Sequence, residues 1–473
     1  MKAEPRQLSE VARPGVSRIV VGTLLFLFLV GLYHANSSLT RIGDIRPNVA
    51  AAISFVNEGN FSFTPVEFPG MFVWELDLRG EVYDLIDLSA WNLPIAGVPA
   101  AKRLADGEIR FSRHPYFLVA SRQDQEYVSR YGLGSPITAV PVFVVLRAAV
   151  GKLRNGDLLS LYAGKFAAAC CVAGSAVFIY LIASMYLSLV PALLVALTYA
   201  MGTSVWSTSS QGLWQHGPNE LYLAMGCYFF IRIREGVHCA ALAGLAVAMA
   251  IMCRPTSAAL GLAIAMTLLV SRDFKLLMYF IAAGSVVGLI PMSYNAIHGD
   301  SILGFAQAME ADRYALAKTG TSSAWQFNIL TNGAGMLFSP SRGLFVFSPV
   351  MAFAVAGIVP AWRDPRFAML RPMSLALALT LLIQFCWFDW WGGWSYGYRL
   401  LVDTMVYLIL FLIPLLPAVW KRRPVAFLFC LTLAWSVFVQ GLGAFASPGR
   451  CSFKDWARLH HRGRVGTTGR SSR

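Results

Sequence analysis

Apolar runs of helix length recur along almost the whole chain, and they limit what it can fold into. Of the 473 residues, 56% are hydrophobic and 14% are charged, and the mean hydropathy is +0.57. The charged residues stand mostly between the runs. A transmembrane helix needs about 20 apolar residues, and a charged side chain in the bilayer is costly. The pattern therefore predicts an all-α polytopic membrane protein.

The first apolar run, Ile19–Tyr33, follows an N-terminal stretch that carries Lys2, Arg6 and Arg13. No small-residue cleavage site comes after it, so we predict a retained helix whose N-terminus lies in the cytoplasm. The other clear runs are Leu158–Ala183, Leu187–Thr203, Glu220–Ile233, Cys239–Cys253, Thr256–Val270, Leu276–Ile297, Leu344–Ala361, Met373–Phe388, Leu400–Val419 and Val425–Phe445.

One further run, Ser135–Val150, decides the orientation of the rest. It is short and holds Pro136 and Pro141, so a helix that lies at the interface or re-enters is expected. If it does not span, about 11 spans remain and the basic loops face the cytoplasm, as is usual; if it spans, these loops face outward. The loops are Arg232/Arg234, Arg272/Lys275, Arg363/Arg366/Arg371 and Lys421/Arg422/Arg423.

The chain divides into one membrane domain and a tail. We expect residues 1–445 to form the transmembrane domain, with residues 36–134 as its first outer loop. Residues 446–473 are basic and lack apolar periodicity, which is typical of disorder. The non-spanning choice for Ser135–Val150 puts the seven Lys and Arg residues of Arg450–Arg473 outside, which is an objection to it.

The net charge of +14 does not indicate a nucleic-acid partner. Short basic loops that set the orientation explain it, and no basic patch with interleaved aromatic residues stands apart from the membrane runs. The eight cysteines lie mostly within apolar runs, with neither disulfide nor metal spacing.

Polar and aromatic residues gather at the outer face in this topology. The first loop starts with Asp44 between Arg41 and Arg46, followed by a helix-compatible stretch at Asn48–Val56 and a turn at Glu58–Phe61. Short strands are expected later in this loop, as a small folded insert. The other outer stretches are residues 204–219, 298–343 and 389–399, and Arg254-Pro255 if the flanking runs form a hairpin.

The order of these features resembles that of the GT-C membrane glycosyltransferases, above all the protein O-mannosyltransferases and the lipid A aminoarabinose transferases. The likeness rests on an apolar first helix, then Gly43-Asp44, then Glu58-Gly59-Asn60-Phe61, and it extends to about Phe445. Further segments that resemble the family are Gly134-Ser135-Pro136 before its apolar run, Leu213–Pro218, Phe338–Leu344 and Trp390–Tyr396.

The resemblance implies an inverting glycosyltransferase in a bacterial inner membrane, with its active site facing outward. Such an enzyme moves a sugar from a polyprenyl-phosphate donor to a glycan, glycolipid or protein acceptor, and the lipid-phosphate sugar is its donor substrate rather than a cofactor. Two alternatives stay open. A lipid-linked sugar transporter or flippase would also place charges within the membrane, and a catalytically silent GT-C-like scaffold would bind the lipid without transfer.

Asp44 is the predicted catalytic base. In the family, an acid after the first helix takes the proton of the acceptor hydroxyl as that oxygen attacks C1 of the sugar. A carboxylate suits this role because it is ionised at neutral pH. The simpler alternative is an ordinary turn or helix-end acid before Asn48–Val56. Ile45 stands where mannosyltransferases often carry a second acid.

Three arginines are candidates for binding the donor phosphate, which guanidinium groups match well. Arg254 lies between two apolar runs, where it needs a cavity or a partner; the alternative is a helix-end arginine that reaches the interface. Arg342 precedes a helix, whose N-terminus favours anions, or it anchors the chain at the interface. Arg399 is the third candidate, or it pairs with Asp403 at i,i+4.

Three further residues are predicted to contact substrate. His216 could bind the sugar or the acceptor, although a lone histidine in a polar loop is more often structural. Trp394 and Tyr396 belong to an aromatic cluster that could stack on a sugar, or to an aromatic belt at the interface. No second ligand lies at metal spacing from His216, so no metal is predicted.

Overall fold

The computed structural model describes residues 16–36, 39, 44–64, 67–68, 71, 75–78, 81–84, 94–95, 98–99, 110–113, 117–122, 126–154, 157–299, 302, 323–393 and 395–446. Arg41, Gly43, Trp394 and the predicted tail after Ala446 lie outside these residues.

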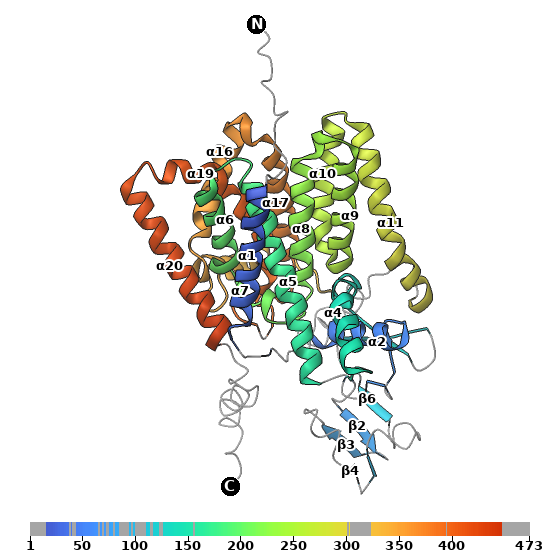
Figure 1. Ribbon diagram of the computed structural model, residues 1–473. Helices are drawn as coiled ribbons and strands as arrows, with labels where there is room; N and C mark the ends of the chain where they lie inside the picture. Colours follow the sequence, from blue (N-terminus) through green and yellow to red (C-terminus); the bar gives the residue numbers. More distant parts are fainter. Residues whose placement is uncertain are drawn as a thin grey trace, which may run out of the picture.

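Apolar helices packed side by side form the body of the molecule. Figure 1 shows α20 and α11 at opposite edges, with α1 and α5 between them. The main helices are α1 (Val16–His34), α5 (Leu158–Ala183), α6 (Leu189–Gly202), α8 (His216–Ile231), α9 (Val237–Cys253), α10 (Ala258–Val270), α11 (Phe274–His298), α17 (Arg371–Phe385) and α20 (Arg423–Ala446).

Six helical stretches among the described residues are long and apolar enough to cross a membrane, so this is a multi-pass membrane protein. A seventh is possible if Leu189–Gly202 and Ser204–Gln211, which meet at 45°, count as one bent span. The six are Ser17–His34, Leu158–Ala183, Phe274–His298, Pro365–Phe385, Arg399–Val419 and Arg423–Ala446. Several other predicted spans form shorter helices, such as α9 and α10.

Small residues let neighbouring helices approach closely. At the α9–α11 contact, a Cβ on Gly244 would lie 2.1 Å from the carbonyl oxygen of Phe280. Gly284, one turn further along α11, faces the Gly244 carbonyl in return. Close backbone approach at small residues is how membrane helices gain packing energy where lipid supplies no hydrophobic drive.

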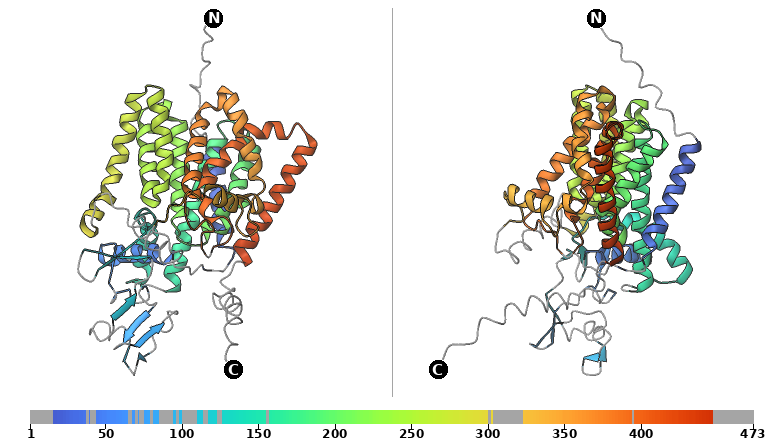
Figure 2. Two further views of the ribbon diagram at one scale, coloured as in Figure 1. Left: turned by 180° about the vertical axis from the view of Figure 1, so that it is seen from behind. Right: turned by 90° about the vertical axis from the view of Figure 1, so that its left-hand side faces the viewer.

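The described residues between α1 and α5 include the helices α2 and α4 and several short strands, at the lower end of the bundle in Figure 1. Helix α2 (Arg46–Glu58) has Pro47 in its first turn and ends at Gly59, whose positive φ of 81° suits a helix C-terminus. Helix α4 (Gly134–Val150) contains Pro141. It packs against α2 and against α5, and in Figure 2 α2 and α4 lie at the lower end of the bundle.

The strands form three small antiparallel sheets with the orders β1-β8-β7, β3-β2-β6 and β4-β5. In the first sheet Ser62 pairs with Val128 and Val119 pairs with Val128 from the other side. The strands are β1 (Ser62–Phe63), β2 (Glu75–Leu78), β3 (Glu81–Asp84), β4 (Pro94–Ile95), β5 (Val98–Pro99), β6 (Arg110–Arg113), β7 (Leu118–Ala120) and β8 (Tyr127–Ser129).

Two apolar runs are broken into short helical pieces. The run predicted at Leu344–Ala361 forms α14 (Leu344–Phe347), α15 (Met351–Ala356) and α16 (Ile358–Arg363). The run at Leu400–Val419 forms η7 (Arg399–Thr404), α18 (Met405–Leu408), η8 (Ile409–Phe411) and α19 (Leu412–Val419). The remaining elements are α7 (Ser204–Ser207), η3 (Ser209–Gln211), η4 (Ile233–Glu235), η5 (Pro255–Ser257), α13 (Ile329–Phe338) and η6 (Pro365–Leu370).

Candidate functional site

Asp44 lies just before α2 and bonds to residues from two distant parts of the chain. Its Oδ2 is 2.6 Å from Nη1 of Arg399, and its Oδ1 accepts a 2.6 Å hydrogen bond from the hydroxyl group of Tyr131. The side chains of Asp44 and Arg399 are each 16% exposed. The carboxylate is thus oriented at both oxygens while it keeps access to solvent.

Tyr131 reaches Asp44 from the turn between β8 and α4. Burial of its hydroxyl group, and then the negative charge of Asp44, raise the pKa of Tyr131 well above its ordinary value. The hydroxyl group therefore keeps its proton at neutral pH and remains a donor to the Asp44 carboxylate.

Arg399 begins η7 and stacks on an aromatic ring as well as bonding to Asp44. Its Cζ lies 4.9 Å from the centroid of the Trp214 ring, a cation–π contact. The alternative prediction that Arg399 simply pairs with Asp403 is wrong. Residues four apart lie about 40° apart around an α-helix but about 120° apart around a 3₁₀ helix, so the two side chains of η7 diverge.

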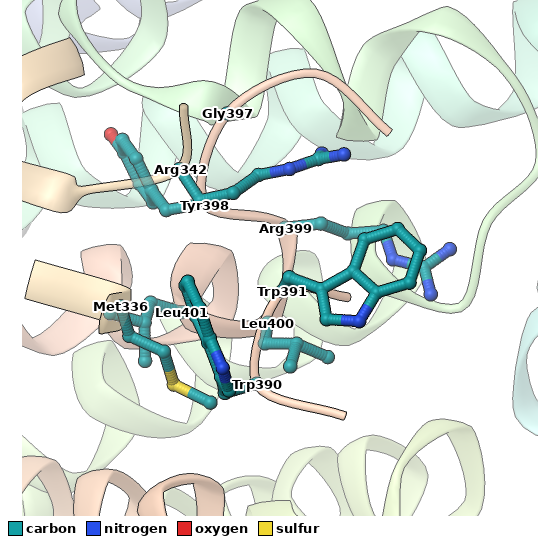
Figure 3. A pocket seen from close by; sticks show the side chains of 9 residues that line it. All are labelled: Met336, Arg342, Trp390, Trp391, Gly397, Tyr398, Arg399, Leu400 and Leu401. Carbon is teal, nitrogen blue, oxygen red and sulfur yellow. The ribbon is translucent and has the colours of Figure 1, made fainter. Parts of the chain in front are cut away.

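A pocket beside Arg399 brings a second guanidinium group close to the first. Figure 3 shows the side chains of Arg342 and Arg399 running in the same direction, with the Trp391 ring next to Arg399 and Tyr398 pointing the other way. Burial, and then the positive charge of Arg399, lower the pKa of Arg342. The pocket is lined by Met336, Arg342, Trp390, Trp391, Gly397, Tyr398, Arg399, Leu400 and Leu401.

The loop of residues 389–399 fixes the Arg342 side chain. Arg342 Nη2 donates to the Gly393 carbonyl at 2.8 Å, and its Cζ lies 5.9 Å from the Trp391 ring centroid. Gly392 and Gly393 have φ of 71° and 69°, which lets the loop turn back toward Arg342. The two guanidinium groups thus lie beside an aromatic wall, and Asp44 balances the charge of one of them.

His216 and Arg254 lie together in a second charged cluster with Asp403. His216 Nδ1 is 3.2 Å from both Asp403 oxygens, and Arg254 Nε is 3.1 Å from Asp403 Oδ2. Arg254 Nη1 lies 2.9 Å from His216 Nδ1. Trp214 stands between the two clusters, because its ring contacts Arg399 on one side and lies 6.3 Å from the His216 ring on the other.

Tyr396 has contacts of a different kind. Its hydroxyl group donates to the Val439 carbonyl at 2.8 Å, and its ring packs edge-on against Phe347 at 5.3 Å. These contacts hold the loop of residues 389–399 against α14 and α20. A sugar contact for Tyr396 stays a prediction, as does one for Trp394, which lies outside the described residues.

Three residues of the site were not singled out as site residues from the sequence. Tyr131 could have been found only from its place next to Gly134-Ser135-Pro136, and Trp214 from the segment it shares with His216. Asp403 was considered as a partner of Arg399 alone. Of its actual partners, His216 lies 187 residues away at the start of α8, and Arg254 lies at the end of α9. At such separations spacing gives no signal.

A guanidinium group and a hydroxyl group face the Asp44 carboxylate, and a cation would be repelled by Arg399. In the described part of the chain, Glu235, His238 and Cys239 are close enough to share an ion. They follow the far end of α8, about 24 Å along its axis from His216, and Arg232 already bonds both Glu235 oxygens.

No protein-family model and no curated protein matches the chain. Among solved structures, it is similar to an oligosaccharyltransferase of Archaeoglobus fulgidus, solved in complex with Zn and sulfate. The identity is 15% and the TM-score 0.52, over 96% of this chain and 56% of that one. The chain has a GT-C-type fold.

A second similar structure is ArnT from Cupriavidus metallidurans bound to undecaprenyl phosphate, at 13% identity and a TM-score of 0.41. The alignment covers 95% of this chain and 64% of that one. The chain thus spans 56% of the length of the oligosaccharyltransferase and 64% of that of ArnT. The similarity to the oligosaccharyltransferase confirms the predicted GT-C likeness for the fold, and a shared fold does not by itself establish an activity.

Proposed function

We propose that this protein is an inverting glycosyltransferase that moves a sugar from a polyprenyl-phosphate donor to an acceptor at the outer face of the membrane. The observation that carries the proposal is the Asp44 carboxylate, held between Tyr131 and Arg399 beside a pocket that two arginines share. An oriented base next to an anion-binding pocket is what this transfer needs.

Asp44 acts as the general base. The Asp44 side chain is 16% exposed, so an acceptor hydroxyl group can reach the carboxylate. That hydroxyl gives its proton to Asp44 as its oxygen forms the new bond to C1 of the sugar. The bond from C1 to the phosphate oxygen breaks on the opposite face, so the anomeric configuration inverts and polyprenyl phosphate leaves.

Arg342 and Arg399 bind the phosphate of the donor. Charge gathers on this group as the C1–oxygen bond breaks, and fixed guanidinium groups stabilise it. Arg254 is not included, because it does not line this pocket and lies in the second cluster with His216 and Asp403. Trp390 and Trp391 form the aromatic wall of the pocket beside these two side chains. The donor carries its own activated bond, so no cofactor is required.

The membrane supplies the donor and fixes the direction of the reaction. We place the active site outward in a bacterial inner membrane, with about 11 spans, residues 36–134 as an outer loop and α4 lying at the interface beside Asp44. The lipid tail of the donor stays in the bilayer, and the acceptor is a glycan, a glycolipid or a protein that arrives from the outside.

Transfer assays on Asp44→Asn test the proposal. Membranes containing the protein are given undecaprenyl-phosphate-linked sugars and a panel of glycan, glycolipid and protein acceptors. Loss of the base should lower the rate about 10²- to 10⁴-fold. The matched control is Glu58→Gln, because Glu58 is an acid at the other end of α2 that pairs with Lys152. It should keep the wild-type rate.

Other outcomes would favour the other classes of function. If well-expressed Asp44→Asn transferred sugar at the wild-type rate, Asp44 would not be the general base. A wild-type protein that moves the labelled lipid across liposomes without consuming it would be a transporter. A wild-type protein that binds undecaprenyl phosphate but transfers to no acceptor of the panel would be a silent scaffold.

A further inference from the structure

Asp403 connects three helical elements in the interior of the bundle. Its carboxylate, 3% exposed, lies 3.2 Å from His216 at the start of α8 and 3.1 Å from Arg254 at the end of α9. Ser257, in the η5 turn after Arg254, donates to Asn219 of α8 at 2.7 Å, which joins the same two helix ends a second time. The cluster therefore forms a rigid frame.

The same short helix that carries Asp403 also carries Arg399. Because η7 is a 3₁₀ helix, the two side chains point about 120° apart: Arg399 reaches outward to Asp44, and Asp403 reaches inward to α8 and α9. The residue before η7, Tyr398, is held separately, since its hydroxyl group accepts from the Ser204 backbone N–H at 3.0 Å. Asp403 is thus the inward anchor within η7 itself.

Asp403 is too deeply buried to contact a substrate, so it can act on the reaction only through its neighbours. We propose that Asp403 is a positioning residue: by bonding His216 and Arg254, it fixes η7 in the orientation from which Arg399 reaches Asp44 and the pocket. This inference rests on the proposed function. It gives His216 and Arg254 a structural role in the frame that holds the site. Neither residue then contacts the substrate.

The test removes the anchor without leaving a charge buried. Asp403→Asn alone would strand the Arg254 guanidinium in the bundle, and an unpaired buried charge is strongly destabilising. The double variant Asp403→Leu/Arg254→Met replaces both partners with apolar side chains of similar reach, which buried ion pairs often tolerate. It should reach the membrane and melt close to wild type, while kcat falls about tenfold and the donor KM changes less than threefold.

The deciding comparison repeats the double variant in an Arg399→Met background. If Asp403 acts through Arg399, the additional loss there should be less than twofold, because residues in one chain of contacts are not additive. An equal tenfold loss in both backgrounds would show general damage to the bundle and overturn the inference. So would a double variant with the wild-type kcat.

Failure of the proposed function would look different, because the wild-type protein itself would then transfer no sugar. If Asp403→Leu/Arg254→Met does not fold, Asp403→Asn/Arg254→Gln replaces it, because it also removes both charges. Its kcat is compared with that of the wild type and measured again in the Arg399→Met background.

Discussion

Replacing Arg399 with Met tests the site through its most connected residue. The substitution keeps the apolar stem and removes the guanidinium group, which bonds to Asp44 at 2.6 Å and lies 4.9 Å over the Trp214 ring. It also removes one of the two positive charges of the pocket. We expect slower transfer with little change in the amount of folded protein.

The magnitude follows from those contacts. A hydrogen bond to a charged group contributes about 1.5–3 kcal/mol, and a cation–π contact about 0.5–2 kcal/mol. Because both charged side chains are 16% exposed, we take the lower ends. The sum of about 2 kcal/mol corresponds to a loss of roughly 30-fold in kcat/KM. Arg399→Lys should fall between wild type and Met, since it keeps the charge but not the planar stacking group.

The assay is the initial rate of sugar transfer in proteoliposomes at several donor concentrations. The control is Arg366→Met, because the Arg366 side chain is 80% exposed and pairs with Asp364 at the surface. It should behave as wild type. A kcat/KM for Arg399→Met within threefold of wild type, at equal expression, would refute the role given to the Asp44–Arg399 pair.

Two further predictions concern the orientation of the base and the packing of the bundle. Tyr131→Phe removes the 2.6 Å hydrogen bond to Asp44 and should lower kcat about tenfold with an unchanged donor KM, measured in the same assay; a wild-type kcat would exclude Tyr131 from the site. Gly244→Ala places a methyl group about 2.1 Å from the Phe280 carbonyl oxygen and should lower the melting temperature in detergent by several degrees. Gly288→Ala, on α11 with nothing within 4 Å of the new methyl group, should melt as wild type, and equal melting of both variants would contradict the α9–α11 contact.

The bundle could be predicted from the sequence because apolar runs of helix length leave few alternatives. Each clear run corresponds to helical structure, and α2 spans the predicted helical stretch in the first loop. The internal breaks could not be predicted. The run Leu400–Val419 has the hydropathy of one straight helix, yet its first residues form a 3₁₀ helix, and no proline or glycine within Arg399–Thr404 indicates that change.

The site could be predicted only where the order of motifs was informative. The predicted candidates included Asp44, Arg342 and Arg399. In the structure Asp44 pairs with Arg399, and Arg342 lines the same pocket as Arg399. The ion pair between Asp44 and Arg399 could not be predicted from the sequence, because the two residues are 355 positions apart. The local spacing of Arg399 and Asp403 suggested a pair that the 3₁₀ geometry prevents.

The most direct test of the central claim is an experimental structure of the protein with undecaprenyl phosphate bound. We predict that the phosphate lies between the guanidinium groups of Arg342 and Arg399, with the Asp44 carboxylate facing the position of the sugar. A phosphate bound at a distance from Asp44, or held by Arg254 in place of Asp403, would contradict it.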